Sequence, residues 1–343
     1  MHIVRQSLLC VVLLVLLVGC EIVTPEPAVE EDAAIEVLFA QSTTGSTGLD
    51  LMLAQAIDSA TSTIDIAAYD LNIGTVVDAL VRAHQRGVTV RLVVEGDYQE
   101  RDGPTELQRV GAPVVIERRD PYMHNKFMVL DDRTVWTGSW NYAYNETYRN
   151  DNNVVIINSQ AVAENYSAEF EEMFTRQLFG AGSPADTPHP QVQIGEAEVQ
   201  VYFSPEDNPQ RQIVDVLKSA QSSIYFMAFN LTDNDISDAL LRKQREGLLV
   251  RGVMEAEQST STGSDYEALQ TGGIDVYLDG NDYRMHHKVF VVDEAVVITG
   301  SYNFTRSAAQ SNDENVLIIY SPEIAARYLE EFSRVYQQAQ EAQ

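Results

Sequence analysis

The chain has 343 residues, and 45% of them are hydrophobic, so it can bury a substantial core and divide into two domains. Its 51 acidic and 23 basic residues give a formal net charge of −28 at pH 7. A field of that sign repels polyanions at long range. It counts against a general DNA-coating protein, but a local basic pocket could still hold one phosphate.

Residues 1–19 have the pattern of an export signal. Arg5 precedes an apolar run from Leu8 to Val18, which is too short to span a membrane as a helix. The sequence Leu17-Val18-Gly19-Cys20 then resembles a bacterial lipobox. The resemblance implies cleavage before Cys20, a lipid on its thiol, and a protein anchored to a membrane of the bacterial cell envelope, outside the cytoplasm. An ordinary signal peptide followed by an unrelated cysteine is the alternative.

Residues 20–34 are acidic and rich in Pro and Ala, and they predict a disordered tether. A first repeat, residues 35–179, follows, in which predicted helices alternate with predicted strands. The helices are expected at 49–59, 73–85 and 161–178, with a shorter one around 106–107, and the strands at 63–69, 88–95, 113–117 and 154–157. Residues 180–196 contain three prolines and predict a linker.

Residues 197–343 repeat the same order of elements. The segment Asp238–Arg242 reads Asp-Ala-Leu-Leu-Arg, and 160 positions earlier the chain reads Asp-Ala-Leu-Val-Arg. A period this long indicates a duplicated domain rather than a solenoid. Strands that alternate with helices predict an α/β fold in which each repeat has a sheet flanked by helices. The sheet must be mixed, because strands joined by a tight turn run antiparallel.

The strongest pattern is a motif that occurs once in each repeat. Both copies read H-x-K-x-x-x-x-D, six further residues and G-S-x-N, and they lie 162 positions apart. The motif residues are His124, Lys126, Asp131, Ser139 and Asn141 in the first copy, and His286, Lys288, Asp293, Ser301 and Asn303 in the second. Each copy predicts a strand, a turn and a second strand, with the serine and asparagine just past its end.

One copy gathers an imidazole, an ammonium, a hydroxyl and an amide, which together suit a phosphate group. A single imidazole cannot be nucleophile and acid at once. Two copies can meet across a pseudo-twofold axis, so that one histidine attacks phosphorus while the other protonates the leaving oxygen. No cluster has metal-ligand spacing, so neither a metal nor a cofactor is expected. His287 should face away from the pocket, because neighbouring strand residues alternate.

On these motifs the chain resembles the phospholipase D superfamily, whose signature is the doubled H-x-K-x-x-x-x-D. The second motif and its Asp-Glu-Asn tail at 313–315 are especially similar to the small bacterial endonuclease Nuc and the mitochondrial cardiolipin hydrolase, homodimers with one motif per chain. The resemblance implies a metal-independent phosphodiesterase that works through a covalent phosphohistidine. It also implies a monomer with one shared site, since this chain carries both motifs.

By position, the resemblance implies a role for each motif residue. The catalytic residues would be His124, Lys126, His286 and Lys288. The phosphate-binding residues would be the two lysines together with Ser139, Asn141, Ser301 and Asn303. Asp131 and Asp293 would be structural and lie outside the pocket. The family's late acidic residue, which supports a histidine, is Glu314 in the second repeat but Asn152 in the first.

This asymmetry leads to a hypothesis about the two histidines. A carboxylate of Glu314 beside His286 would favour the protonated ring, whereas an amide of Asn152 beside His124 would leave that ring neutral. The same asymmetry is known in tyrosyl-DNA phosphodiesterases, where the first histidine attacks. The hypothesis is that His124 is the nucleophile and His286 the acid, unless Asp151 supplies the missing charge to His124.

Three functions stay open. A phospholipase D-type head-group hydrolase is favoured, because the tether would keep an acidic enzyme on its lipid substrate. A Nuc-like nuclease is the alternative, for which Arg118, Arg119 and Arg284 could form a small basic rim. A non-catalytic lipoprotein that binds phosphorylated ligands is the third. The expected partners are therefore a membrane, through Cys20, and a phosphodiester substrate, lipid or nucleic acid.

Overall fold

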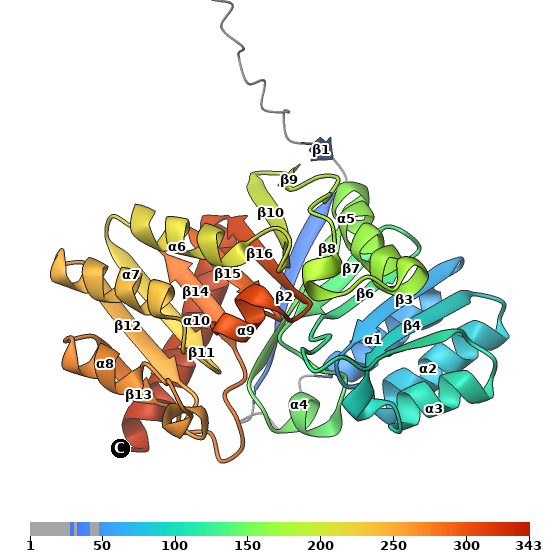
Figure 1. Ribbon diagram of the computed structural model, residues 1–343, viewed down its shortest axis with the longest axis horizontal. Helices are drawn as coiled ribbons and strands as arrows, with labels where there is room; N and C mark the ends of the chain where they lie inside the picture. Colours follow the sequence, from blue (N-terminus) through green and yellow to red (C-terminus); the bar gives the residue numbers. More distant parts are fainter. Residues whose placement is uncertain (1–27, 31–32, 42–47) are drawn as a thin grey trace, which may run out of the picture.

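The computed structural model describes residues 28–30, 33–41 and 48–343 (Figure 1). The predicted signal peptide, Cys20 and most of the predicted tether lie outside these residues. The chain forms two α/β halves side by side, coloured blue to green and yellow to red in Figure 1. Within the described ranges, no helix combines the length and the apolar character needed to cross a membrane.

The first half contains a seven-stranded sheet with the order β2-β8-β7-β6-β3-β4-β5. The pairs β3–β4 and β4–β5 are parallel, and all other pairs in this sheet are antiparallel. Its strands are β2 (Ala34–Ala40), β3 (Thr63–Ala68), β4 (Thr89–Glu95), β5 (Val114–Glu117), β6 (Lys126–Leu130), β7 (Thr134–Gly138) and β8 (Asn152–Asn158).

The second half repeats this sheet and extends it. The order β10-β16-β15-β14-β11-β12-β13 corresponds strand by strand to the first sheet, and β9 and β1 add two strands at its edge. The strands are β1 (Ala28–Glu30), β9 (Gln191–Ile194), β10 (Ala197–Ser204), β11 (Ser223–Ala228), β12 (Leu249–Met254), β13 (Asp275–Leu278), β14 (Lys288–Val292), β15 (Val296–Gly300) and β16 (Glu314–Tyr320).

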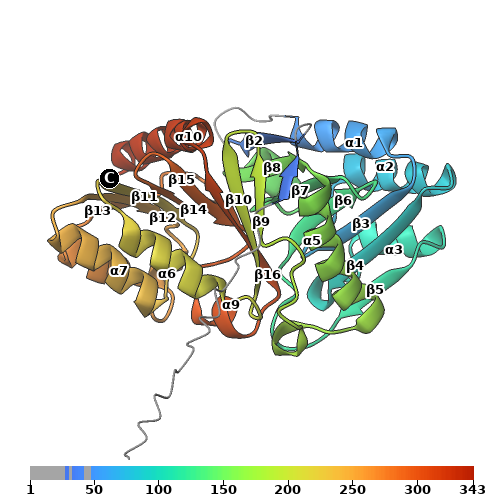
Figure 2. The ribbon, with the colours of Figure 1, turned by 90° about the horizontal axis from the view of Figure 1, so that it is seen from above.

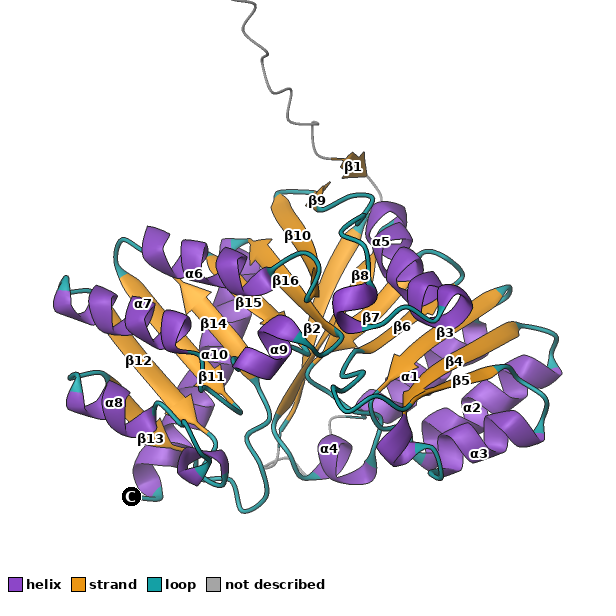
Figure 3. Ribbon diagram, viewed as in Figure 1, coloured by secondary structure: helices purple, strands orange, loops and turns teal. Residues whose placement is uncertain are grey.

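Helices lie against both sheets, as the purple ribbons of Figure 3 show. In the first half they are α1 (Leu49–Ser59), α2 (Gly74–Gln85), α3 (Asp102–Arg109), α4 (Tyr144–Tyr148) and α5 (Gln160–Glu171). In the second half they are α6 (Pro209–Ser219), α7 (Asn234–Arg245), α8 (Tyr266–Thr271), α9 (Arg306–Gln310) and α10 (Pro322–Glu341). The prediction of two tandem repeats, each a mixed sheet flanked by helices, is confirmed.

The buried side chains form three clusters. One lies under α1 and α2 in the first half, and its equivalent lies under α6 and α7 in the second. The third joins the halves, because it includes Tyr166 of α5, Tyr328 of α10 and strand residues from both sheets. Helix α5 also contacts β10 of the other half, and α10 contacts β2 (Figure 2). The two repeats therefore share one central core.

The structure departs from the predicted elements in four places. Strands β2 and β10, the first of each repeat, were not predicted. Residues 28–30 of the predicted tether form β1, which pairs with β9, and β9 itself lies within the predicted linker. Helices α4 and α9 were not predicted, because five residues are too few to show helical periodicity. The predicted helix 161–178 ends at Glu171 and continues as a π-turn over Glu172–Arg176.

Candidate active site

The two motif copies occupy equivalent places in the two halves. Lys126 is the first residue of β6 and Lys288 the first of β14, so each motif histidine lies two residues before a strand. Ser139 and Ser301 directly follow the last residues of β7 and β15. The predicted strand, turn and strand are thus present in both copies, and the histidine, lysine and serine of each copy are buried.

The glycine before each motif serine is required by close packing. Gly138 has φ 137°, and a Cβ there would lie 2.3 Å from the carbonyl oxygen of Asn153. Gly300 has φ 142°, and its Cβ would lie 2.2 Å from the carbonyl oxygen of Asn315. Both positions combine positive φ with contact to the adjacent strand, which only glycine accommodates. The G-S-x-N pattern therefore has a structural reason for its first residue.

Each motif histidine is bound by the late polar residue of the other repeat. His124 Nδ1 lies 2.7 Å from Glu314 Oε2, and His286 Nδ1 lies 2.9 Å from Asn152 Oδ1. The prediction that Glu314 lies beside His286 and Asn152 beside His124 was therefore wrong. A carboxylate only accepts hydrogen bonds while ionised, so the neutral His124 ring must carry its proton on Nδ1 and keep its lone pair on Nε2.

The exchange of partners follows from how the halves meet. The backbone N–H of His124 donates to the carbonyl of Asp313, and the N–H of His286 donates to the carbonyl of Asp151. Asp313 directly precedes β16, and Asp151 directly precedes β8. Each histidine segment is thus held against the start of a strand of the other repeat, β16 for His124 and β8 for His286, and the first residue of that strand reaches the ring. Local spacing in the sequence contains no signal for this crossing.

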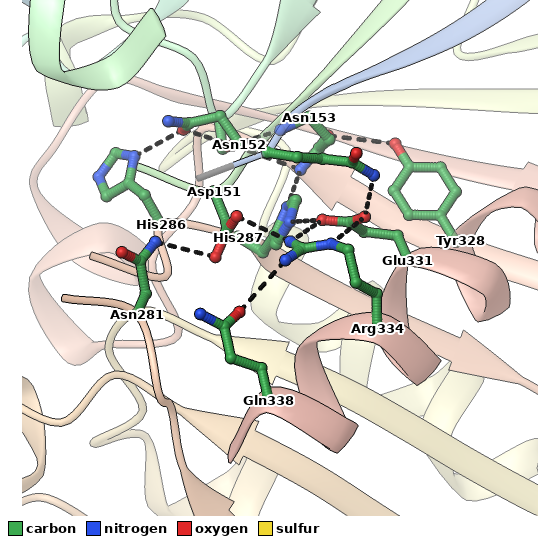
Figure 4. Close-up of polar contacts among 12 residues, drawn as sticks. Asp151, Asn152, Asn153, Asn281, His286, His287, Tyr328, Glu331, Arg334 and Gln338 are labelled. Atoms are coloured by element: carbon green, nitrogen blue, oxygen red, sulfur yellow. Dashed lines mark hydrogen bonds and ion pairs between the residues drawn. The ribbon is translucent and has the colours of Figure 1, made fainter. Parts of the chain in front are cut away.

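Asp151 does not supply a charge to His124. Its carboxylate accepts hydrogen bonds from Arg334 Nη2 at 2.7 Å and from Asn281 Nδ2 at 2.9 Å (Figure 4). His287 belongs to the same buried network, where its ring lies 3.2 Å from Asn153 Nδ2 and 3.1 Å from Glu331 Oε1 (Figure 4). His287 therefore points away from His286 into the shared core, as the sequence predicted.

The motif serines orient the partners of the histidines. Ser301 Oγ donates to Glu314 Oε2 at 2.7 Å, and Ser139 Oγ donates to Asn152 Oδ1 at 2.9 Å. Both hydroxyls also accept a backbone N–H from the following strand. Each serine is thus engaged with the histidine partner of its own repeat, and the contact with phosphate predicted for it stays a prediction.

The motif asparagines keep hydrogen-bonding capacity for a bound group. Their side-chain oxygens, Asn141 Oδ1 and Asn303 Oδ1, are buried without a hydrogen-bond partner in the part of the chain that the structure describes. A buried amide oxygen without a partner costs free energy. Both amide oxygens can therefore accept a hydrogen bond from a bound group, and the contact with phosphate predicted for Asn141 and Asn303 stays a prediction.

Both lysine side chains are buried beside an aromatic ring, Lys126 beside Tyr69 and Lys288 beside Phe229, each with Nζ 4.8 Å from the ring centroid. Lys126 Nζ donates to the carbonyl of His124 at 2.8 Å, and Lys288 Nζ to that of His286 at 2.9 Å. Burial lowers the pKa of Lys126 to about 7, although the nearby carboxylates oppose the shift. Burial likewise lowers the pKa of Lys288 well below its ordinary value. A phosphate between these ammonium groups would offset the cost of burying them.

The histidines are also desolvated and lie within electrostatic reach of the opposite lysine. Burial lowers the pKa of His124 to about 4, with Glu314 opposing the shift and the two lysines adding to it. Burial lowers the pKa of His286 well below its ordinary value, and the lysines and His124 act in the same direction. Because each motif histidine also contacts a side chain of the opposite repeat, both motif copies belong to a single site.

A carboxylate that sequence reasoning missed also belongs to this site. Glu146 on α4 accepts hydrogen bonds from Asn152 Nδ2 at 2.8 Å and Asn141 Nδ2 at 3.2 Å, and its Oε2 lies 3.4 Å from His286 Nδ1. Its signal in the sequence is weak, because the equivalent residue of the second repeat, Ala308, cannot make these contacts.

The motif aspartates lie at the opposite end of their strands from the lysines. Asp131 follows β6 and accepts backbone N–H groups from residues 61–63, and Asp293 follows β14 and accepts them from residues 221–223. Burial alone would raise the pKa of Asp131, but these N–H groups lower it to about 2. Both aspartates clamp a turn, and neither contacts a motif histidine, lysine, serine or asparagine.

A cavity of about 500 Å³ opens beside Glu146, and acidic side chains outnumber basic ones in its lining. Its charged lining residues are Asp70, Arg101, Glu146, Glu257, Asp282 and Arg284. Of the arginines expected to form a basic rim, Arg284 pairs with Glu257 at 3.1 Å and Arg119 with Asp313 at 2.7 Å. Arg118 donates to Gln99. Two of the three are therefore neutralised by carboxylates.

Comparison with known proteins agrees with this arrangement. The family described as cardiolipin synthase, PLD-like domain, matches the chain twice, at residues 53–174 and 213–336. A protein named phospholipase D from Rickettsia bellii is 33% identical over 42% of this chain and 75% of its own length. A mitochondrial cardiolipin hydrolase from Chlamydomonas reinhardtii is 32% identical over 36% of this chain, which spans only 56% of that relative.

A solved structure covers nearly the whole chain. The phosphatidylserine synthase of Haemophilus influenzae Rd KW20 matches with a TM-score of 0.66 over 89% of this chain and 86% of that one, at 16% sequence identity. At this identity the likeness concerns the fold alone. Because the family model matches both repeats and together covers more than half of the residues, the chain belongs to the phospholipase D-like family in a two-repeat form.

Proposed function

We propose that the protein hydrolyses phosphodiesters through a phosphohistidine intermediate, without a metal. The observation that supports this best is the crossed pair of histidines, each held at Nδ1 by the opposite repeat and backed by a buried lysine. Two imidazoles whose Nε2 atoms have no hydrogen-bond partner among the described residues can divide the roles of nucleophile and acid. The lysines and amides supply donors for the non-bridging oxygens.

The reaction proceeds in two balanced steps. Nε2 of one histidine forms a bond to phosphorus, the P–O bond to the leaving alcohol breaks, and the protonated second histidine gives that alcohol its proton. Water then attacks the phosphohistidine, and the second histidine, now neutral, takes a proton from it. The P–N bond breaks and a phosphomonoester leaves. Both rings return to their starting states, and no oxidant or reductant is consumed.

We assign His124 as the nucleophile, for a reason that differs from the sequence hypothesis. Attack through Nε2 puts positive charge on the ring, and the Glu314 carboxylate bound to Nδ1–H stabilises that charge directly. By charge alone His124 would be the acid, because its partner is the carboxylate. The developing positive charge on the attacking ring outweighs this consideration, since it arises in the transition state.

The substrate that fits best is a phospholipid, with release of its head group. The net charge of −28 and the acidic cavity beside the site oppose a long polyanion. Pairing of Arg119 and Arg284 with carboxylates leaves little basic surface for a nucleic-acid backbone. A lipid presents one phosphodiester at a time and needs no extended basic surface.

A direct comparison of substrates tests this function. Purified protein would be given mixed phosphatidyl lipids and single-stranded DNA at equal phosphate concentration, with His124→Ala as the control. Lipid turnover that disappears in the variant is the expected result. Turnover of DNA alone would establish the nuclease alternative. Ligand binding without turnover, unaffected by His124→Ala, would establish the non-catalytic alternative.

The anchor is a separate part of the proposal. A lipid on Cys20 would hold the enzyme at a membrane of the cell envelope and make up for the absence of electrostatic attraction. In cells fed labelled palmitate, the wild-type protein should carry label, and Cys20→Ser should remain unlabelled or unprocessed. A soluble, unlabelled wild-type protein in the medium would contradict the anchor without affecting the catalytic proposal.

A further inference from the structure

The two repeats carry a carboxylate near the histidines at different positions. In the second repeat, position 314 is glutamate and position 308 is alanine. In the first repeat the equivalent position 152 is asparagine, and the equivalent position 146 is glutamate. At these two positions each repeat therefore offers one carboxylate, on β16 in the second repeat and on the short helix α4 in the first.

The geometry places Glu146 behind the partner of His286. Asn152 Oδ1 lies 2.9 Å from His286 Nδ1, while its Nδ2 donates to Glu146 Oε2 at 2.8 Å. The same carboxylate oxygen lies 3.4 Å from His286 Nδ1 itself. Asn141 Nδ2 donates to the other oxygen at 3.2 Å. These contacts fix the amide of Asn152, because its NH₂ group faces the carboxylate and its oxygen faces the ring.

The surroundings of His286 oppose its protonation, so the protonated ring needs a negative charge nearby. The charged or titratable groups that act against its protonation are Lys288, Lys126, His124 and Arg284, in addition to burial. Glu314 is bound to the other histidine. Among the described residues, Glu146 is the carboxylate whose oxygen lies within 4 Å of the His286 ring.

We propose that Glu146 is a positioning residue for His286, and that it replaces in space the carboxylate that position 152 lacks. It holds the Asn152 amide in the orientation that accepts Nδ1–H, and its charge favours the protonated ring that must give a proton to the leaving oxygen. This role rests on the proposed phosphodiesterase function. It concerns the acid step alone, because His124 has its own carboxylate.

The leaving group provides the test. In Glu146→Gln the amide keeps the size and one acceptor but loses the charge. Dihexanoylphosphatidylcholine requires protonation of its leaving alcohol, whereas dihexanoylphosphatidyl-p-nitrophenol releases p-nitrophenolate without it. We expect kcat on the choline lipid to fall roughly 10- to 100-fold, and kcat on the nitrophenyl lipid to change less than about 3-fold. Glu267→Gln on α8 is the control, because it removes the same charge from an exposed site.

An exchange of residues provides a second test. Glu146→Ala combined with Asn152→Glu rebuilds in the first repeat the glutamate and alanine of the second, with the net charge unchanged. The double variant should recover at least about tenfold of the choline-lipid activity that Glu146→Ala alone loses. Melting temperatures of all variants would show whether each protein is folded.

The outcomes separate this inference from the proposed function. Equal losses on both lipids in Glu146→Gln would overturn the positioning role and point to a structural one. A folded double variant no more active than Glu146→Ala would overturn it too. If the wild-type protein turns over neither lipid, the proposal of a lipid substrate is wrong. The same comparison is then made with DNA and a p-nitrophenyl diester of a nucleotide in place of the two lipids.

Discussion

The two half-sites share a geometry but differ in how their charge is supplied. His124 has a carboxylate in direct contact, 2.7 Å from Nδ1. His286 has an amide at 2.9 Å and a carboxylate behind it at 3.4 Å. The backbone contact, the serine contact and the lysine contact are the same in both halves. A duplicated site can therefore keep its positions fixed while its two rings acquire different chemical roles.

The difference extends beyond the hydrogen-bond partners. The ring that lies against His124 is Tyr69, and the ring against His286 is Phe229, with centroid distances of 4.7 and 4.5 Å. Asp70 stands next to Tyr69, where the second repeat has Asn230. The first repeat thus contributes two carboxylates to the site region, Asp70 and Glu146. A site assembled from two identical chains could not be made asymmetric in this way by substitution.

Separate substitutions of the two histidines should have the largest effects on activity and should differ most between the two halves. His124→Ala removes the nucleophile, and kcat should fall by about 10⁶-fold on any substrate. His286→Ala removes the acid, and kcat should fall roughly 10²- to 10⁴-fold on an alkyl diester. With a p-nitrophenyl diester, His286→Ala should still form a phosphoprotein and release it slowly, while His124→Ala should form none.

Mass spectrometry of peptides from each variant locates the adduct. The expected site is His124 in the His286→Ala protein. An adduct on His286 in the His124→Ala protein would reverse the two roles and show that the carboxylate partner marks the acid. The doubly substituted protein is the control for non-specific phosphorylation.

Substitution of the lysines tests a feature that both halves share, a buried lysine next to the motif histidine. Lys126→Met and Lys288→Met should each lower kcat/KM about 10²- to 10³-fold, because each removes a buried donor to the developing charge. Neither variant should melt below the wild type, because burial disfavours both ammonium groups in the free protein. A clear fall in melting temperature with little change in kcat/KM would show that the lysines serve the fold instead.

The sequence predicted the features that occur within each repeat. The motif spacing, the alternation of elements and the duplicated order predicted the two sheets and the convergence of both motifs. It failed where the answer depended on contact between repeats. Glu314 and His286 belong to the same motif region, yet Glu314 reaches His124, because each histidine segment pairs with the residue that precedes β8 or β16 of the other half. Glu146 was missed because the second repeat has alanine at that position.

The two aspartates that precede β8 and β16 provide a test through stability. Asp151 pairs with Arg334, whereas burial raises the pKa of Asp313 to about 7 despite its contact with Arg119. A raised pKa means that the folded state binds the proton more tightly than the unfolded state. Stability should therefore fall as the pH rises between about 4 and 7.

Burial also raises the pKa of two nearby carboxyls, Glu172 to about 7 and Glu206 to about 8, and they act in the same direction. The buried histidines and lysines act in the opposite direction, because burial lowers their pKa values, so the test is a difference between variants. Between pH 5.5 and pH 8 the wild-type protein should lose more melting temperature, or gain less, than Asp313→Asn, whereas Asp151→Asn should change as the wild type does. An equal change in the wild type and Asp313→Asn would show that Asp313 does not contribute to the pH dependence.

The smallest expected effect is that of chelation. Both half-sites obtain their positive charge from Lys126 and Lys288 and their proton transfer from the two histidines, so neither half depends on a divalent ion in the proposed mechanism. Turnover in excess EDTA should equal turnover in its absence, measured on the same lipid and at constant ionic strength. Dialysis against EDTA before the assay controls for slow release of a tightly held ion. Loss of turnover that Ca²⁺, Mg²⁺ or Zn²⁺ restores would overturn the mechanism for both halves at once, because a metal would then provide the charge assigned here to the lysines.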